Sequence, residues 1–243
     1  MTVLAIETAT AVCGAAVIRG GGGVMGEARV ESPHVHSEQL ISLVDAALRG
    51  AGLESGGIDG IAVSVGPGSF TGLRIGLSVA KGLAYAWNKP LVPVFTLEAL
   101  AMAAVQQSLA VSGSLIVATI DARRAEVYAA VYRRVNDALE EVVSSRAVQI
   151  RDLASIVPAE APVIVMGDGA DKFHEFLEQG GSSTSSRFVI PSRDRRLCSA
   201  VAVGLLGERA LASGQTADIA SVEPLYVKDF QSLVRTAQLE VQS

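Results

Sequence analysis

A glycine-rich turn that joins a short apolar strand to a long helix dominates the first third of this sequence. The apolar run 61–65 predicts a buried strand. Gly66 and Gly68 allow a tight turn directly behind it, and Ser69 can cap the first amides of the helix that follows. The helical pattern lasts until about residue 87. A buried strand, a tight turn and a long helix in this order indicate an α/β fold.

The long helix carries small residues on one side. Positions four apart lie along one face of a helix, and this face holds Gly72, Gly76, Ala80 and Ala84. Each interior glycine costs a helix about 1 kcal/mol relative to alanine, which indicates that something packs there at close range. A neighbouring face is apolar, with Ile75, Val79, Leu83 and Ala86. We therefore expect two surfaces to cover the helix: its own sheet, and either another helix of this chain or another protein.

The whole chain divides into two units of similar architecture. In the first unit, strands are expected at 3–6, 13–18, 24–30, 61–65 and 91–94, and helices at 37–50, 69–87 and 96–109. In the second unit, strands are expected at 115–120, 126–133, 140–149, 162–166 and 188–190, and helices at 171–177 and 197–211. Each unit is a three-strand meander followed by alternating strands and helices, which predicts a mixed sheet with helices on both faces. We expect one lobe at 1–111 and a second at 112–243, with the C-terminal segment packing back on the first.

Charge and composition exclude several classes of protein. The chain has 243 residues and a net charge of −5, which argues against a basic nucleic-acid surface across the whole chain. Cys13 and Cys198 lack metal or redox spacing, so buried, reduced thiols are expected. The N-terminus shows no basic leader pattern, and no apolar run reaches spanning length. These features predict a cytoplasmic protein without membrane contact.

Phosphate binding is the first chemistry to weigh. The turn at Gly66 lacks the third glycine of a dinucleotide fingerprint and the Gly-Lys-Ser/Thr ending of a Walker loop, so a structural or interface role is favoured. Glu7 and Asp121 end the first strand of each unit, where they either line a crevice or accept hydrogen bonds from their own turns. The remaining candidates for a nucleotide or phosphate contact are Glu7, Thr8, Gly66, Gly68, Ser69 and Asp121.

Metal and nucleophile chemistry have less support. His34 and His36 stand near Glu38, but zinc sites need three or four ligands. No serine lies in a nucleophile elbow, and no cysteine has a recognisable base beside it. We expect no metal site and no catalytic residue in this chain.

Four stretches, at 3–10, 36–40, 66–76 and 121–128, resemble the TsaB (YeaZ) family of bacterial proteins. The resemblance implies a pair of actin-like (ribonuclease H-like) lobes, in agreement with the repeated architecture. It also implies a role in making threonylcarbamoyladenosine, the modified base beside the anticodon of tRNAs that read ANN codons. The catalytic relative TsaD carries two metal-binding histidines on a helix. The corresponding helix here starts at Thr96 and contains no histidine, so the metal-dependent transfer is not carried over.

By this resemblance the chain is a non-catalytic partner of TsaD. The ATPase TsaE is expected to join the complex, and tRNA to be reached indirectly through it. Family members alone tend to form homodimers through the helices of the first lobe. No cofactor is expected in the chain itself, although a nucleotide at the partner interface is compatible with the family.

The small-residue stripe suggests where such a partner would dock. The hypothesis is a bundle of helices in which this chain contributes Leu40, Val44, Leu48, Gly72, Gly76 and Ala80. Two other classes stay open: an actin-like ATPase or phosphotransferase, and a metallopeptidase-like protein. The first loop has no glycine, which weakens the ATPase interpretation, and the lack of metal ligands weakens the peptidase interpretation.

Overall fold

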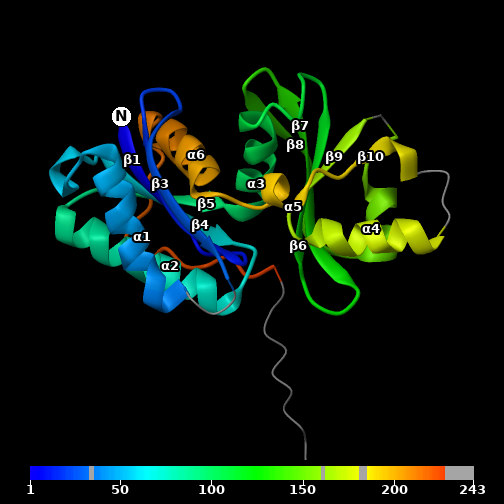
Figure 1. Cartoon of the computed structure of the whole chain (residues 1–243), viewed down its shortest axis with the longest axis horizontal. Helices are drawn as coiled ribbons and strands as arrows, with labels where there is room; N and C mark the ends of the chain where they lie inside the picture. The colour runs from blue at the N-terminus through cyan, green and yellow to red at the C-terminus, as the bar shows by residue number, and fades with distance from the viewer. Residues whose placement is uncertain (33–35, 160–161, 181–184, 228–243) are drawn as a thin grey trace, which may run out of the picture.

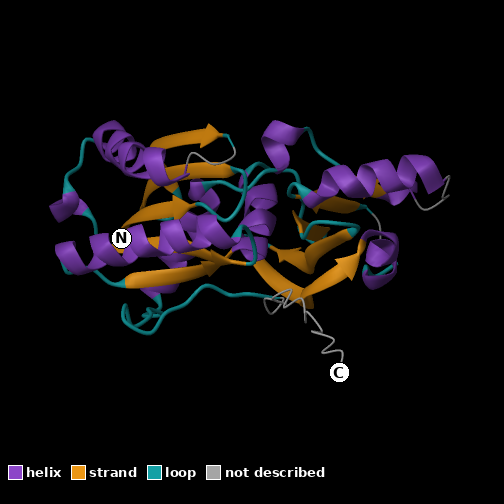
Figure 2. Cartoon of the chain, turned by 90° about the horizontal axis from the view of Figure 1, so that it is seen from below, coloured by secondary structure: helices purple, strands orange, loops and turns teal. Residues whose placement is uncertain are grey.

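The computed structural model describes residues 1–32, 36–159, 162–180 and 185–227. Both views separate the strands into two groups, one in each of two lobes that lie side by side (Figure 1, Figure 2). The first sheet has the strand order β3-β2-β1-β4-β5, and the second has the order β8-β7-β6-β9-β10. In each sheet the first three strands in sequence are antiparallel neighbours, and the two later strands add in parallel. The predicted mixed sheet with a three-strand meander is confirmed in both halves.

The first lobe follows the apolar pattern closely. Its strands are β1 (Thr2–Glu7), β2 (Val12–Arg19), β3 (Gly23–Glu31), β4 (Gly60–Gly66) and β5 (Leu91–Phe95). Its helices are α1 (His36–Ala51), α2 (Phe70–Trp87) and α3 (Thr96–Gln106), with a 3₁₀ turn, η1 (Ser55–Gly57). Strands β1 and β4 are buried throughout because helices cover both faces of the sheet centre, whereas the edge strand β3 alternates between half-buried and exposed residues.

The second lobe has shorter helices. Its strands are β6 (Leu115–Asp121), β7 (Glu126–Val135), β8 (Ala138–Gln149), β9 (Val163–Met166) and β10 (Phe188–Val189). Its helical segments are η2 (Ile150–Ile156), α4 (Gly169–Gly180), η3 (Ser185–Arg187) and α5 (Arg193–Arg196). The helices at η2 and α5 were not predicted, because each is too short to show a helical period.

One shared core joins the lobes. Helix α3 contacts both β4 and β6, and it packs beside α6 (Ala200–Ala212) between the two sheets (Figure 1). Buried residues of this core come from both sheets and both helices, among them Ala62, Met102, Ile116 and Val203. On the far side of the first sheet, α1 packs on β2 and β3, and α2 packs on β4. The lobes are therefore fixed to each other by a helical layer that both sheets share.

The chain returns to the first lobe after residue 199. Helix α6 packs on β1, β2, β4 and β5 of the first sheet. The sequence predicted this helix at 197–211 in the second unit; it starts at Ala200, where Ser199 caps it by accepting a hydrogen bond from the amide of Ala202 at 3.3 Å. The division at 111 separates the two sheets, but 200–227 lie with the first sheet. Sequence order had grouped this helix with the second unit, while a C-terminal segment was expected to pack back on the first.

Candidate functional site

The glycines of α2 face the end of strand β1. A side chain at Gly72 would place its Cβ 2.1 Å from the carbonyl oxygen of Thr8, and one at Gly76 would place its Cβ 2.1 Å from Thr8 Oγ1. Thr8 Oγ1 also donates a hydrogen bond of 2.8 Å to the carbonyl of Gly72. The close packing that the two glycines predicted is therefore confirmed, and the partner in that contact belongs to the same chain.

The residues of the docking hypothesis lie on the inner sides of the two helices, so their contact with a partner stays a prediction. All six residues are buried inside the first lobe: Leu40, Val44, Leu48, Gly72, Gly76 and Ala80. The physical reason is that the stripe with the smallest residues lets α2 approach its own sheet most closely, which buries the most apolar area. The small-residue stripe is therefore covered by this chain's own first lobe.

A different face of α1 and α2 is open to solvent. Ile41 on α1 is 55% exposed and Tyr85 on α2 is 83% exposed. Between the core and this surface, α2 carries a half-buried apolar row that the sequence had already shown as a second stripe: Ile75, Val79 and Leu83. We call the solvent-facing surface of the two helices the α1–α2 face. It includes Ile41 of α1, the line of Arg74 and Tyr85 on α2, and, further around α2, the half-buried row Ile75, Val79 and Leu83. In the sequence, the half-buried row on α2 was indicated by the second apolar stripe, which contains no glycine.

The turn before α2 uses its polar groups within the chain. The amide of Gly66 donates to Thr96 Oγ1 at 3.2 Å, and the amide of Ser69 donates to the carbonyl of Ala9 at 2.7 Å. Ser69 Oγ caps α2 by accepting from the amide of Gly72 at 3.2 Å. A Cβ at Gly68 would lie 2.2 Å from the carbonyl of Ala9, so the turn is pressed against the loop after β1. These contacts tie the loop after β1 to the start of α2.

Glu7 and Asp121 occupy equivalent strand ends but differ in surroundings. Glu7 is fully buried, and its Oε1 accepts a hydrogen bond from the amide of Ala9 at 2.8 Å. Burial raises the pKa of the Glu7 carboxyl, although hydrogen bonds, led by that from Ser64, act in the opposite direction. Asp121 is exposed and forms an ion pair with Lys172. The two candidates therefore lie in matching places of the fold, but only Glu7 is enclosed.

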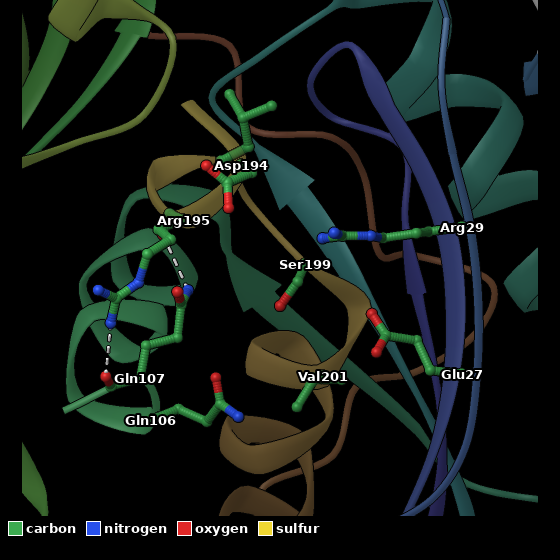
Figure 3. A pocket seen from close by; sticks show the side chains of 9 residues that line it. Glu27, Arg29, Gln106, Gln107, Asp194, Arg195, Ser199 and Val201 are labelled. Atoms are coloured by element: carbon green, nitrogen blue, oxygen red, sulfur yellow. Dashed lines mark hydrogen bonds between the residues drawn. The ribbon is translucent and has the colours of Figure 1, made fainter. Parts of the chain in front are cut away.

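A polar pocket of about 340 Å³ opens between the lobes (Figure 3). It is lined by residues of β3, α3, α5 and α6, and it holds two acidic and two basic side chains: Glu27, Asp194, Arg29 and Arg195. Gln107 and Arg195 are linked in one wall of the pocket by two hydrogen bonds. The side-chain amide of Gln107 donates to the backbone carbonyl of Arg195 at 2.8 Å, and the Arg195 guanidinium donates to the backbone carbonyl of Gln107 at 3.1 Å. None of the predicted phosphate candidates lines this pocket. Its balanced charges give no preference for an anion.

The family model for TsaD: tRNA N6-adenosine threonylcarbamoyltransferase matches residues 16–222. Among curated relatives, the tRNA threonylcarbamoyladenosine biosynthesis protein TsaB of Bacillus subtilis is 32% identical over 183 residues, which cover 73% of this chain and 76% of the relative. TsaB of Haemophilus influenzae is 35% identical over 135 residues, about half of either chain. The chain belongs to this family, in its TsaB (YeaZ) branch.

A solved TsaB-type structure supports the same conclusion at the level of the fold. YeaZ from Pseudomonas aeruginosa is 27% identical, matches with a TM-score of 0.76, and covers 93% of this chain and 99% of its own. The expectation of two actin-like lobes, drawn from the resemblance, is confirmed by this likeness together with the repeated strand order.

Three smaller expectations concern thiols, metals and membranes. Cys13 and Cys198 are buried and unpaired, as expected, and burial raises the pKa of the Cys13 thiol to about 11. Across residues 1–32, 36–159, 162–180 and 185–227, no three His, Cys, Asp or Glu side chains come together as metal ligands would. The pair His34 and His36 falls outside the side chains that the structure describes, so that part of the expectation stays a prediction. None of the helices in the described ranges has the length and apolarity needed to span a bilayer.

Proposed function

We propose that this chain acts in threonylcarbamoyladenosine biosynthesis as a non-catalytic partner of a TsaD-type transferase. The family membership supports the pathway, because the curated TsaB relatives are named for that biosynthesis. The observation that carries the partner role is the α1–α2 face, where an isoleucine of α1 and a tyrosine of α2 stand in solvent and α2 also carries a half-buried apolar row. Exposed apolar surface of this kind is typical of protein interfaces.

The non-catalytic part of the proposal has its own support. The candidate groups near the turn at Gly66 hydrogen-bond within the chain, and Glu7 is enclosed. The helix that starts at Thr96 carries no histidine in the position where the catalytic relative places its metal ligands. We propose that the chain supports the transferase by binding it, that TsaE joins the pair, and that tRNA is reached through the complex. The same face would pair two copies of the isolated chain.

Complex formation with the TsaD-type protein tests this proposal. The wild-type chain should form a defined complex, measured by size-exclusion chromatography with light scattering and by calorimetric titration. Ile41→Asp and Tyr85→Ala should each weaken it about tenfold or more, because they remove exposed anchors without disturbing the core. Val189→Asp is the matched control, since Val189 is 49% exposed on the second lobe.

Two outcomes would contradict the proposal. If wild type forms no complex with the transferase, the partner role fails. If the Ile41 and Tyr85 variants bind as tightly as the Val189 control, the interface lies elsewhere. The alternative actin-like ATPase is examined in parallel by titrating ATP and ADP into the isolated chain; tight binding with turnover would revive it.

A further inference from the structure

The segment 213–227, which we call the C-terminal strap, crosses the first lobe after α6. The amide of Ala217 donates to the carbonyl of Leu91 at 2.8 Å, and the amide of Leu225 donates to the carbonyl of Val65 at 2.7 Å. Ile219 and Val222 of the strap pack against the core beneath α1 and α2. Figure 1 shows this segment in orange to red, running along the first lobe near α2. The strap is therefore built into the first lobe at both ends.

The turn at Gly66 is shaped to receive the strap. Gly66 has a φ of +120°, a conformation that side chains rarely adopt. A Cβ there would lie 2.5 Å from the carbonyl oxygen of Leu225. The strap thus reaches the strand-to-helix turn itself and places the next residue, Tyr226, beside the first turn of α2.

Tyr226 and Phe70 both contact the side chain of Arg74. Arg74 Nε donates a hydrogen bond of 3.1 Å to Tyr226 Oη, and its guanidinium carbon lies 3.8 Å from the centre of the Phe70 ring. The two aromatic rings lie 5.2 Å apart at an angle of 32°. A long arginine side chain normally loses rotamer entropy when it binds. Here much of that ordering has already taken place in the unbound chain.

Arg74 has no acidic partner in the ranges that the structure describes. Its Nε is used by Tyr226, while its two terminal nitrogens have no hydrogen-bond acceptor there. Other arginines behave differently: Arg193 and Arg196 both pair with Asp171. An exposed, oriented guanidinium whose two terminal nitrogens bond to no residue in the described ranges is suited to a carboxylate, which accepts two parallel hydrogen bonds.

Arg74 also lies on the proposed interface. It is three helical turns before Tyr85, so the two residues fall along nearly the same line of α2. Arg74 and the exposed Tyr85 therefore lie on the same side of α2.

We infer that Arg74 is a recognition point for an acidic side chain of the TsaD-type partner, and that Tyr226 of the strap is its positioning residue. This inference rests on the proposed function, because it names one charged contact within that interface. It assigns the C-terminal strap to the partner surface, although the strap follows the second lobe in sequence.

Binding titrations with the TsaD-type protein test the inference through a cycle of variants. Arg74→Gln should weaken the complex about tenfold or more, and Arg74→Lys should recover little, since lysine lacks the planar fork. Tyr226→Phe removes only the hydroxyl and should weaken binding about threefold. In the Arg74→Gln background, Tyr226→Phe should have no further effect, because its role is to orient the arginine. Arg74→Gln should also flatten the salt dependence of the affinity.

Arg151→Gln is the matched control, because it removes an exposed positive charge from η2 on the other lobe. Thermal unfolding of each variant checks that the fold is intact. If wild type does not bind the partner, the proposed function and this inference fall together. If the complex forms but the Arg74 and Tyr226 variants match the Arg151 control, or if the two substitutions add independently, this inference alone is overturned. Lost affinity for ATP or tRNA with unchanged partner binding would instead assign Arg74 to a phosphate.

Discussion

The two lobes share one strand order but differ in what covers their outer faces. On the first sheet, two long helices, α1 and α2, lie outside the strands. On the second sheet, the outer apolar cluster is closed by α4 and the 3₁₀ segment η2, which follows the meander where α1 follows it in the first lobe. The strand scaffold is therefore compatible with very different surfaces. The length of the segments that cross between strands decides which lobe presents a broad helical face.

The two lobes also solve one packing problem in the same way. In the first lobe, Gly72 and Gly76 leave room for Thr8. In the second, Gly167 and Gly169 leave room for Thr119. A Cβ at Gly167 would lie 1.8 Å from the carbonyl oxygen of Thr119. In both lobes a threonine near the end of the central strand sits against the glycine-containing start of a helix. These glycines serve the fold of each lobe.

The largest effect is expected for Gly76→Val. The new side chain would overlap Thr8, so the free energy of unfolding should fall by about 3 kcal/mol or more, as measured by urea denaturation. Gly82→Val is the matched control on the same helix, because outside its chain neighbours and the backbone of the helix itself no atom of the described residues lies within 4 Å of its Cβ position. Similar stability of the two variants would show that the contact with Thr8 does not constrain α2.

A pH-dependent effect is expected for Glu7→Gln. Burial raises the pKa of the Glu7 carboxyl in the folded state above its ordinary value of 4.5. The folded protein therefore binds this proton more tightly than the unfolded chain does, and the associated stability is lost as the pH rises through the folded pKa. Glutamine cannot ionise, so the stability of the variant relative to wild type should increase as the pH rises from about 5 to about 8.

Unfolding curves at several pH values measure the difference between the Glu7 variant and wild type. A difference that stays constant across this range would mean that the folded and unfolded chains bind this proton equally tightly, so that burial does not raise the pKa of the Glu7 carboxyl.

The smallest effect is expected for Asp121→Asn. The substitution removes the ion pair with Lys172 but keeps an oxygen for the amide of Arg123, which donates to Asp121 Oδ1 at 2.6 Å. Partly exposed ion pairs contribute little, so the stability should fall by less than about 1 kcal/mol. A loss as large as that of Gly76→Val would show that the second strand end carries as much of the fold as the first.

The sequence predicted most of the strands and helices, but it did not predict which face of each helix packs on a sheet. Apolar runs such as 61–65 and 162–166 predicted strands because a strand buried on both faces has few polar residues. Helix α2 has two adjacent apolar stripes, and periodicity cannot say which one faces the sheet when both can be buried. That choice depends on Thr8, which lies 64 positions before Gly72 and has no sequence signal for the contact.

A C-terminal segment packing back on the first lobe was expected, but the sequence did not show that α6 belongs to it, for a related reason. Helix α6 is apolar and well capped, so its existence was predictable, but nothing in its pattern tells which of two sheets it will cover. The contact between Tyr226 and Arg74 spans 152 positions and joins a helix to a segment without secondary structure. Short-range patterns carry no information about such a pair, and only the assembled fold brings it together.

The path of α6 and the strap has a consequence for synthesis on the ribosome. The first sheet is translated early, yet the helix that covers its inner face and the segment that meets the turn at Gly66 are among the last to emerge. Until then, the inner faces of β1 and β4 lack the cover that α6 provides, and folding must wait for contacts of very long sequence separation. A nascent chain that stalls before residue 200 would contain the strands of the second sheet, but its first sheet would lack the helix α6 that covers its inner face.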